Sequence, residues 1–272
     1  MSATERKPIL EMRGISKRFG AVQALSDVDF EVYLGEVVGL VGDNGAGKST
    51  LIKIISGAYH ADAGHYIFDG REVAVNSPRD ATALGIETVY QDLALCDNLD
   101  VVANLYLGRE RTRTLIPGLV KIIEEIPMEQ EANRIVNELH IRIPSIRSQV
   151  ASLSGGQRQS AAVSRAVMWN SKVVLLDEPT AALGVEQTHQ VKELIRRLRD
   201  RGLGVVVISH NLADVFDVCD RIIVLRLGKR GATFQTNTTN AEQVVAAITG
   251  AEFGVTDNGK DKTSDNASHS DQ

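Results

Sequence analysis

The chain has 272 residues, a hydrophobic content of 43% and a formal net charge of −5 at pH 7, which suits one large domain, alone or with a subdomain. The acidic balance and the lack of a long basic run disfavour a general nucleic-acid binder. Its two cysteines, Cys96 and Cys219, lie far apart with no metal-ligand residues beside them, which disfavours a disulfide scaffold or a zinc site and favours a reducing compartment.

Apolar segments along the chain are short. The opening stretch, MSATERKPIL, lacks an apolar core of the length that a signal peptide needs. The longest apolar runs have the length of strands and fall well short of the roughly 20 residues of a membrane span. If the protein works at a membrane, we expect other chains to supply the spans.

Strand-like and helix-like segments alternate along the chain. The alternation in VDFEVY, residues 28–33, predicts a half-buried strand. The continuous apolar runs at 36–41, 173–177 and 204–209 predict strands that are buried on both faces. Between residues 191 and 198, apolar residues recur at the spacing of one helix face, with arginines in the gaps. Together these segments predict an α/β sandwich with a largely parallel sheet.

Two further stretches differ from this pattern. Residues 92–170 have few strand-like runs, several helical ones and three prolines, so we expect a mainly helical subdomain inserted in the α/β core. The last stretch, 251–272, is largely polar and is expected to be a disordered tail. The predicted domain therefore covers residues 5–250.

The segment GDNGAGKST matches the phosphate-binding loop pattern, with Gly42, Gly47, Lys48 and Ser49 at the defining positions. Glycine permits the backbone angles that aim the loop amides at phosphate oxygens, and the helix expected to follow adds its unpaired N–H groups. Lys48 is expected to neutralise the β- and γ-phosphates, Ser49 to offer a hydroxyl to Mg²⁺, and Thr50 to lie near the α-phosphate. The alternative is a glycine-rich turn with an exposed lysine, which the strand and helix on either side disfavour.

In VVLLDE, a buried strand ends in two carboxylates, Asp177 and Glu178. Neighbouring strand residues point to opposite sides, so Asp177 can hold the Mg²⁺ shell while Glu178 polarises a water molecule. This division suits metal-assisted phosphoryl transfer to water. Taken alone, the motif also fits an ordinary strand end with solvated charges.

In LSGGQRQ, residues 153–159, a serine that can cap a helix precedes two glycines and a helical segment. The amides at such a helix start can receive an anion. A second anion-binding helix start in one chain suggests that two copies share their nucleotides across an interface. Taken alone, the segment fits a simple helix-entry turn equally well.

In order along the chain, these motifs resemble those of the ATP-binding subunits of ABC transporters, over residues 9 to 250. GDNGAGKST resembles Walker A, VYQDL the Q-loop, LSGGQ the signature, VVLLDE Walker B and ISHNL the switch-histidine segment; KRFGAVQAL resembles the segment whose aromatic stacks on adenine. The resemblance implies a P-loop NTPase core with a mainly parallel sheet, an antiparallel β subdomain and the inserted helical subdomain.

The resemblance also implies residue roles. Two copies would face head to tail, and each ATP would lie between Walker A of one copy and the signature of the other. The implied nucleotide-binding set is Phe19, Gly42, Asn44, Gly45, Gly47, Lys48, Ser49 and Thr50, with Ser154, Gly155, Gly156 and Gln157 from the second copy. The implied catalytic set is Glu178 as base or water-orienting group, His210 at the γ-phosphate and Gln91. The implied Mg²⁺ set is Ser49, Asp177 and Gln91, and Gln91 would link the metal to the membrane partner.

One position departs from the family pattern. TAALGV places Gly184 where the family usually has an aspartate that reaches across the dimer. The same variant, with IETVYQDLALCDNLDVVANLYLGRE, resembles the monosaccharide-importing branch in a form with a single ATPase domain. This implies ATP and Mg²⁺ as cofactors, a homodimer, a transmembrane permease and, indirectly, an exported sugar-binding protein. It also implies a place at the cytoplasmic face of the membrane and no nucleic-acid partner.

Other classes stay open at this point. A soluble ABC ATPase acting on DNA would need long coiled-coil insertions, whereas only 61 residues separate Gln91 from Leu153. A ribosome-acting member would usually carry two ATPase halves and a charged linker. A non-sugar transporter ATPase is a further alternative, as is a sensor that binds ATP without turnover. The sensor stays possible because Gly184 replaces the family's usual aspartate.

Overall fold

The fold is described from a computed structural model, which covers residues 7–116 and 120–251. The expected tail lies outside these residues, apart from Ala251. The main sheet has the order β12-β11-β3-β10-β9-β6 and is parallel except for β12. Its strands are β3 (Glu36–Val41), β6 (Ile86–Val89), β9 (Val173–Asp177), β10 (Gly204–Ile208), β11 (Arg221–Arg226) and β12 (Lys229–Gln235). The predicted parallel α/β core is confirmed.

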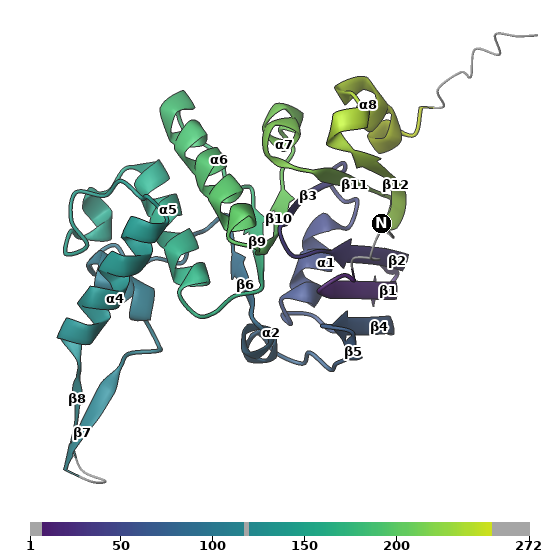
Figure 1. Ribbon diagram of the computed structural model, residues 1–272. Helices are drawn as coiled ribbons and strands as arrows, with labels where there is room; N and C mark the ends of the chain where they lie inside the picture. The colour runs from purple at the N-terminus through teal and green to yellow at the C-terminus, as the bar shows by residue number, and fades with distance from the viewer. Residues whose placement is uncertain (1–6, 117–119, 252–272) are drawn as a thin grey trace, which may run out of the picture.

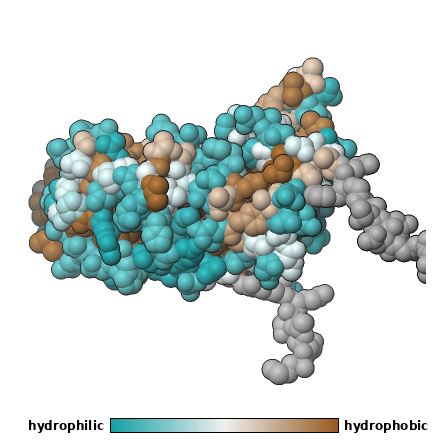
Figure 2. All heavy atoms as spheres, turned by 90° about the horizontal axis from the view of Figure 1, so that it is seen from above, coloured by the Kyte–Doolittle hydropathy of each residue, from teal (hydrophilic) through white to brown (hydrophobic). Residues whose placement is uncertain are grey.

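Both faces of the main sheet are buried, which explains the continuous apolar runs. Along β3, Val38 and Leu40 join one core cluster while Val37 and Val41 join another. Helices on the second side are α5 (Gly155–Val167), α6 (Val185–Asp200), α7 (Leu212–Val218) and α8 (Ala241–Thr249). Figure 2, seen from above over α6, α7 and α8, shows a mostly hydrophilic surface with hydrophobic side chains gathered toward the α8 end.

On the first side, helix α1 (Lys48–Ile55) packs between the main sheet and a second, antiparallel sheet of order β2-β1-β4-β5 (Figure 1). The strands of that sheet are β1 (Leu10–Phe19), β2 (Val22–Val32), β4 (Ala63–Phe68) and β5 (Arg71–Glu72), and helix α2 (Pro78–Leu84) leads into β6. The predicted strand at 28–33 is the end of β2, whose Val28, Phe30 and Val32 are fully buried.

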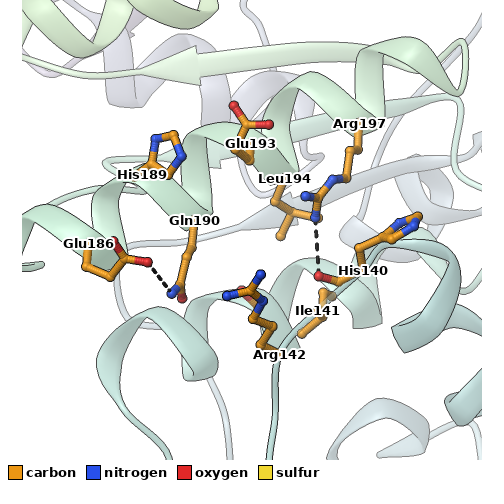
Figure 3. Close-up of a pocket in the computed structure, with 10 residues that line it drawn as sticks. His140, Ile141, Arg142, Glu186, His189, Gln190, Glu193, Leu194 and Arg197 are labelled. Atoms are coloured by element: carbon orange, nitrogen blue, oxygen red, sulfur yellow. Dashed lines mark hydrogen bonds between the residues drawn. The ribbon is translucent and has the colours of Figure 1, made fainter.

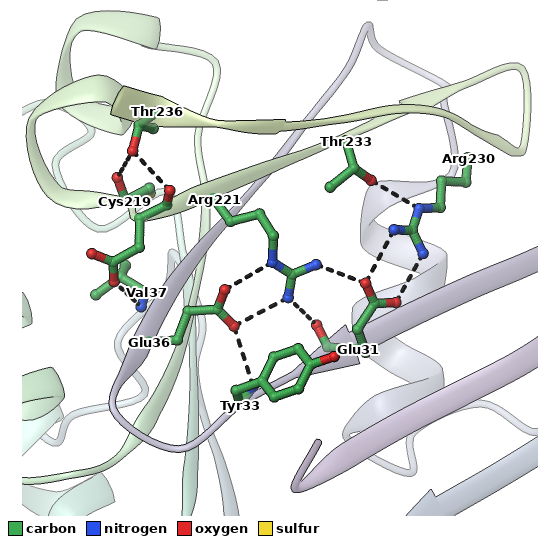
Figure 4. Close-up of polar contacts among 10 residues, drawn as sticks. Glu31, Tyr33, Glu36, Val37, Cys219, Arg221, Arg230, Thr233 and Thr236 are labelled. Atoms are coloured by element: carbon green, nitrogen blue, oxygen red, sulfur yellow. Dashed lines mark hydrogen bonds and ion pairs between the residues drawn. The ribbon is translucent and has the colours of Figure 1, made fainter. Parts of the chain in front are cut away.

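A buried ion-pair network joins the two sheets (Figure 4). Arg221, at the start of β11, donates from Nε to Glu36 Oε1 at 2.8 Å and from Nη1 to Glu31 Oε1 at 2.7 Å. Arg230 of β12 donates to Glu31 Oε2 at 2.8 Å. A buried charge is tolerated only when it is paired in this way, so the network fixes how β2 lies against β3 and β11.

Residues 92–170 have a core of their own. Its helices are α3 (Val101–Tyr106), α4 (Glu125–Glu138), the 3-10 turn η1 (Val150–Ser152) and α5. Elsewhere in the chain, a second 3-10 turn, η2 (Thr236–Thr238), precedes α8. An antiparallel hairpin of β7 (Thr112–Ile116) and β8 (Val120–Ile123), which was not predicted, stands out from this part of the molecule (Figure 1). Its strands are short, and the proline between them was interpreted only as a helix breaker.

Candidate active site

The carboxyl ends of four neighbouring parallel strands open at one edge of the main sheet. Ile208 of β10 pairs with Leu40 of β3 on one side and with Asp177 of β9 on the other. Beyond β9, Val89 of β6 pairs with Leu176. The loops that follow these strands hold the phosphate-loop motif, Glu178, His210 and Gln91, so the topology places motifs from distant parts of the sequence along one edge. Ligands of open α/β sheets bind at this kind of edge.

The phosphate loop joins β3 to α1, and two of its glycines have no room for a side chain. Gly42 has φ 149°, and a Cβ there would lie 2.1 Å from Leu225 O. Gly47, at the N-cap of α1, has φ 104°, and a Cβ would lie 2.6 Å from Leu25 Cδ2. Glycine is therefore required at both positions for backbone angle and for space.

Lys48, the first residue of α1, is half-buried and bends back over the loop. Its Nζ donates to Gly42 O at 2.6 Å and to Asp43 O at 3.0 Å. Burial lowers the Lys48 pKa, while the nearby carboxylates of Glu178, Asp43 and Asp177 oppose that shift. Asn44, Gly45 and Ser49 are exposed around it, with Thr50 in the same turn. The result is a cation beside a glycine-rich loop at a helix N-terminus, which suits a polyphosphate.

Asp177, Glu178 and His210 lie at the carboxyl ends of β9 and β10, at the same edge of the sheet as the phosphate loop. Burial raises the Asp177 pKa, and the neighbouring Glu178 carboxylate adds to the shift. Glu178 has φ 50°, and its N–H donates to Ile208 O at 2.9 Å, which turns the chain sharply after β9. His210 Nδ1 lies 2.9 Å from Glu178 Oε1. Sequence reasoning gave both residues roles at the γ-phosphate but did not foresee this direct contact.

Gln91 is exposed, two residues beyond β6, and the segment after it is held by an arginine that sequence reasoning missed. Arg165 of α5 donates from Nη1 to Ala94 O at 2.8 Å and from Nη2 to Leu93 O at 3.1 Å. The Gln91 segment is therefore tied to the helix that begins with the signature motif. An arginine in a helical segment carries no sequence signal for such a distant contact.

Phe19 ends β1 at the tight turn into β2 and is 43% exposed. Its ring packs edge to face on Tyr59 at a centroid distance of 5.3 Å, with Lys17 Nζ 5.5 Å from the ring centroid. Strand β2 runs directly against the phosphate loop, since a Cβ on Gly47 would lie 2.8 Å from Ala24 O. Phe19 is thus an accessible aromatic on the hairpin that borders the loop.

The signature residues are not brought to the phosphate loop. Ser154 caps α5 in a capping box, in which Ser154 Oγ accepts from Gln157 N at 3.3 Å and Gln157 Oε1 accepts from Ser154 N at 2.9 Å. Gly155 and Gly156 pack against the start of α6 and the segment before it, where added Cβ atoms would meet Gln187 and Leu183. Among the described residues, no hydrogen bond or ion pair joins these four residues to the loop of Gly42–Lys48.

A cavity of about 350 Å³ lies between α6 and the segment that links α4 to the signature (Figure 3). Arg197 of α6 donates from Nη1 to Leu139 O at 2.8 Å, and Arg142 O accepts from Gln157 Nε2 at 3.1 Å. Arg142 and Gln190 project into the gap between these elements (Figure 3). These contacts join the signature to α6, the helix that follows Asp177 and Gly184.

The loop, cation and acids at the carboxyl edge of a parallel sheet define a P-loop nucleotide-binding domain. The comparisons with known proteins narrow this class. The model of the ABC transporter family matches residues 25–181. The chain belongs to the ABC transporter family and is an ATPase, as the sequence motifs indicated.

Similar proteins and structures extend over most of the chain. It is 48% identical to the xylose/arabinose import ATP-binding protein XylG of Sulfolobus acidocaldarius, over 90% of this chain and 96% of that one. It is 46% identical to the fructose import ATP-binding protein FrcA of Rhizobium meliloti, over 90% and 95%. The structure of a nucleotide-free ATP-binding cassette from an ABC transporter has a TM-score of 0.75 at 26% identity, covering 89% of this chain and 96% of that chain. The same TM-score is found for an ATP-binding cassette in its ADP conformation, at 27% identity.

Proposed function

We propose that the chain energises the import of a monosaccharide, hydrolysing ATP at the cytoplasmic face of a membrane while a separate permease carries the sugar. The relatives named for xylose/arabinose and fructose import support this class over a nucleic-acid or ribosome ATPase. Within the described part of the chain, no helix is long and apolar enough to cross a bilayer. The permease, and an exported sugar-binding protein that feeds it, would be separate chains.

The observation that carries the proposal is the half-built nucleotide site. The phosphate loop, Asp177, Glu178 and His210 share one edge, whereas the signature helix start of the same chain lies elsewhere. A second copy placed head to tail would bring its Ser154, Gly155 and Gly156 to the γ-phosphate held by the first. Residues 5–250 would act as one ATPase domain, with the signature carried by the segment 92–170.

Within that site, each residue has a role that its surroundings support. Lys48 would release the carbonyl oxygens of Gly42 and Asp43 and bind the β- and γ-phosphates instead. Carbonyl oxygens and phosphate oxygens are both hydrogen-bond acceptors for its ammonium group. Glu178 would orient the attacking water, and His210, 2.9 Å from it, would hold the carboxylate and reach the γ-phosphate. Phe19 would stack on the adenine, and Gln91 would link Mg²⁺ and the attacking water to the permease.

Mg²⁺ fits the residues present. The described residues contain no cluster of three or more His, Cys, Asp and Glu side chains able to hold a metal alone. Ser49 and Asp177 offer two hard oxygen ligands, directly or through water, and Mg²⁺ takes its remaining ligands from phosphates and water in sites of this chemistry. The ion would neutralise charge on the phosphates, and its own charge would keep Asp177 ionised against the burial that raises its pKa.

A crosslinking experiment tests the shared site. Asn44→Cys and Ser152→Cys are introduced in separate copies that also carry Cys96→Ser, and the copies are mixed with a short bismaleimide. Both introduced positions are exposed in the single chain. Mg-ATP should give a crosslinked dimer that ADP does not give and that Lys48→Ala abolishes. Equal crosslinking with and without nucleotide would contradict the arrangement, and ATPase stimulation by a co-reconstituted permease and sugar would test the import assignment.

A further inference from the structure

The hairpin of β7 and β8 is exposed at residues 112–115 and 120–123. Its strands pair as Arg113 with Ile122 and Thr114 with Lys121, and Glu124 N donates to Arg111 O at its base, at 2.9 Å. Figure 1 shows it reaching away from the body, at the opposite end of the molecule from α8. An isolated two-stranded hairpin is marginally stable in water, so we expect this hairpin to be stabilised by contact with another surface.

Apolar side chains gather on this hairpin although, within the described residues, its strands pair only with each other. Leu115 is 58% exposed and Ile123 is 53% exposed, with Val120 and Ile122 also exposed. Because paired residues share a face, Ile122 lies on the same face as Arg113, and Val120, two residues away on β8, lies there too. Contiguous exposed apolar residues of this kind mark an interaction surface.

The same hairpin carries a small positive charge in an acidic chain. Residues 112–123 contain one arginine, one lysine and no acidic residue, whereas the whole chain has a net charge of −5. Arg109 is paired with Glu87 at 3.0 Å. Among the described residues, Arg113 and Lys121 form no ion pair with an acid. Because neighbouring strand residues point to opposite faces, one cation lies on each face of the hairpin: Arg113 with Val120 and Ile122, and Lys121 with Ile123. We call Arg113, Leu115, Val120, Lys121 and Ile122 the hairpin patch.

We infer that the hairpin patch docks on the anionic lipid surface of the membrane at which the ATPase works. This inference rests on the proposed function, which places the chain beside a bilayer. Basic side chains next to a few apolar ones are the composition that binds an anionic interface, with the cations at the headgroups and the apolar side chains below them.

Charge favours lipid over the permease as the occupant. Cytoplasmic loops of membrane proteins are enriched in Lys and Arg, which would repel Arg113 and Lys121, whereas the cytoplasmic leaflet attracts them. The contact adds a second anchor beside the permease and orients the helical part of the ATPase relative to the bilayer. The attraction is weak for two cations, so the docking is reversible and sensitive to salt.

Vesicle co-sedimentation of the full chain tests the inference. Vesicles of phosphatidylcholine alone are compared with vesicles of equal parts phosphatidylglycerol and phosphatidylcholine. The unmodified chain should co-sediment with the anionic vesicles at low salt and should dissociate from them at high salt. The double variant Arg113→Glu/Lys121→Glu should bind at least about 25-fold more weakly, since each basic residue near such a surface contributes about fivefold. Leu115→Ser/Ile122→Ser should also weaken binding while leaving the salt dependence in place.

The matched control is Lys7→Glu/Lys229→Glu, which changes the net charge equally at exposed positions away from the hairpin. This control should bind anionic vesicles much as the unmodified chain does. Equal binding to both vesicle types, or equal loss in the hairpin and control variants, would overturn the inference. Loss of a detergent-solubilised permease from the hairpin variant, with vesicle binding unchanged, would assign the patch to the permease instead.

The same variants separate this inference from the proposed function. Thermal melting of the purified variants checks that the fold is intact. Mg-ATP-dependent crosslinking between copies should be unchanged in Arg113→Glu/Lys121→Glu, because the hairpin lies outside the nucleotide edge. Loss of crosslinking in the unmodified chain would instead count against the shared nucleotide site, whatever the vesicles show.

Discussion

The substitution Gly184→Asp restores the carboxylate that this chain lacks after Walker B, and the structure permits it. Gly184 is the N-cap of α6 with φ −71° and ψ 167°, angles that any residue can adopt. A Cβ there would meet nothing within 4 Å. The new carboxylate can accept from the free amides of the first turn, where the helix N-terminus favours negative charge.

The expected gain in stability has two sources, the capping hydrogen bond of the new carboxylate and the interaction of its charge with the helix N-terminus. Asp in place of Gly as an N-cap contributes a few tenths of a kcal/mol, and its charge near the helix N-terminus adds about 0.3–1 kcal/mol. The free energy of unfolding should therefore rise by roughly 0.5–1 kcal/mol, which raises the Tm of a chain of this size by about 1–4 °C. Scanning calorimetry without nucleotide measures this directly.

The functional effect is measured as ATPase rate against ATP concentration. If a carboxylate at this position couples the two sites, Gly184→Asp should change the cooperativity or the basal rate. Asn240→Asp is the matched control, because Asn240 Oδ1 caps α8 through Gln243 N at 2.9 Å, far from the nucleotide edge. A fall in Tm would refute the geometric reasoning. A rise in Tm with kinetics identical to those of the control would discard the coupling role.

Other residues give shorter tests. Glu178→Gln keeps a hydrogen-bonding partner for His210 at 2.9 Å, so ATP binding by titration should persist while turnover falls at least about 100-fold; unchanged turnover would remove Glu178 from its role. Arg165→Lys cannot reach both carbonyls of 93 and 94, so proteolysis near that segment should quicken while ATP affinity is kept. Burial raises the Asp177 pKa above its unfolded value, so ionisation of Asp177 opposes folding as pH rises. Asp177→Asn should raise the Tm of the nucleotide-free chain at neutral pH, with the gain vanishing below about pH 4; a gain that does not shrink there would contradict this cause.

Elements with a strong local signal were predictable from the sequence. The apolar runs that form β3, β9 and β10 lie between two cores, so both faces of each strand are covered and no alternation appears. The apolar spacing expected between residues 191 and 198 matches the buried face of α6, which includes Val191 and Leu194. The serine of LSGGQ caps α5 as expected. Each of these features is decided within a few residues.

Features that depend on distant contacts were not predictable. The Glu178–His210 contact joins segments 32 residues apart through the pairing of β9 with β10, and periodicity carries no trace of it. Arg165 reaches back 71 residues to Ala94. The hairpin of β7 and β8 is too short and too exposed for its alternation to stand out from a loop. Tertiary geometry fixes all three.

Gln157 provides the sharpest test of which way the signature faces. In the single chain, Gln157 Oε1 already accepts a hydrogen bond from Ser154 N at 2.9 Å. In the proposed shared site, a γ-phosphate would therefore bind the amides of Gly155 and Gly156, or it would displace the Gln157 side chain from Ser154 N. Gln157→Glu preserves the capping box, because a glutamate accepts from the same amide. It loses the bond from Nε2 to Arg142 O. In the proposed shared site it would also place a negative charge beside the γ-phosphate bound by the second copy.

Folding and ATP binding at the chain's own phosphate loop should therefore survive in Gln157→Glu, since neither depends on that face. Mg-ATP-driven dimerisation, followed by light scattering or the crosslink, should weaken by about 10-fold or more, because like charges meet with little solvent between them. The neutral variant Gln157→Ser loses the cap but adds no charge, and should weaken dimerisation less than Gln157→Glu does. If Gln157→Glu dimerised as well as the unmodified chain, the signature helix would not face a phosphate, and the shared site would have to be abandoned.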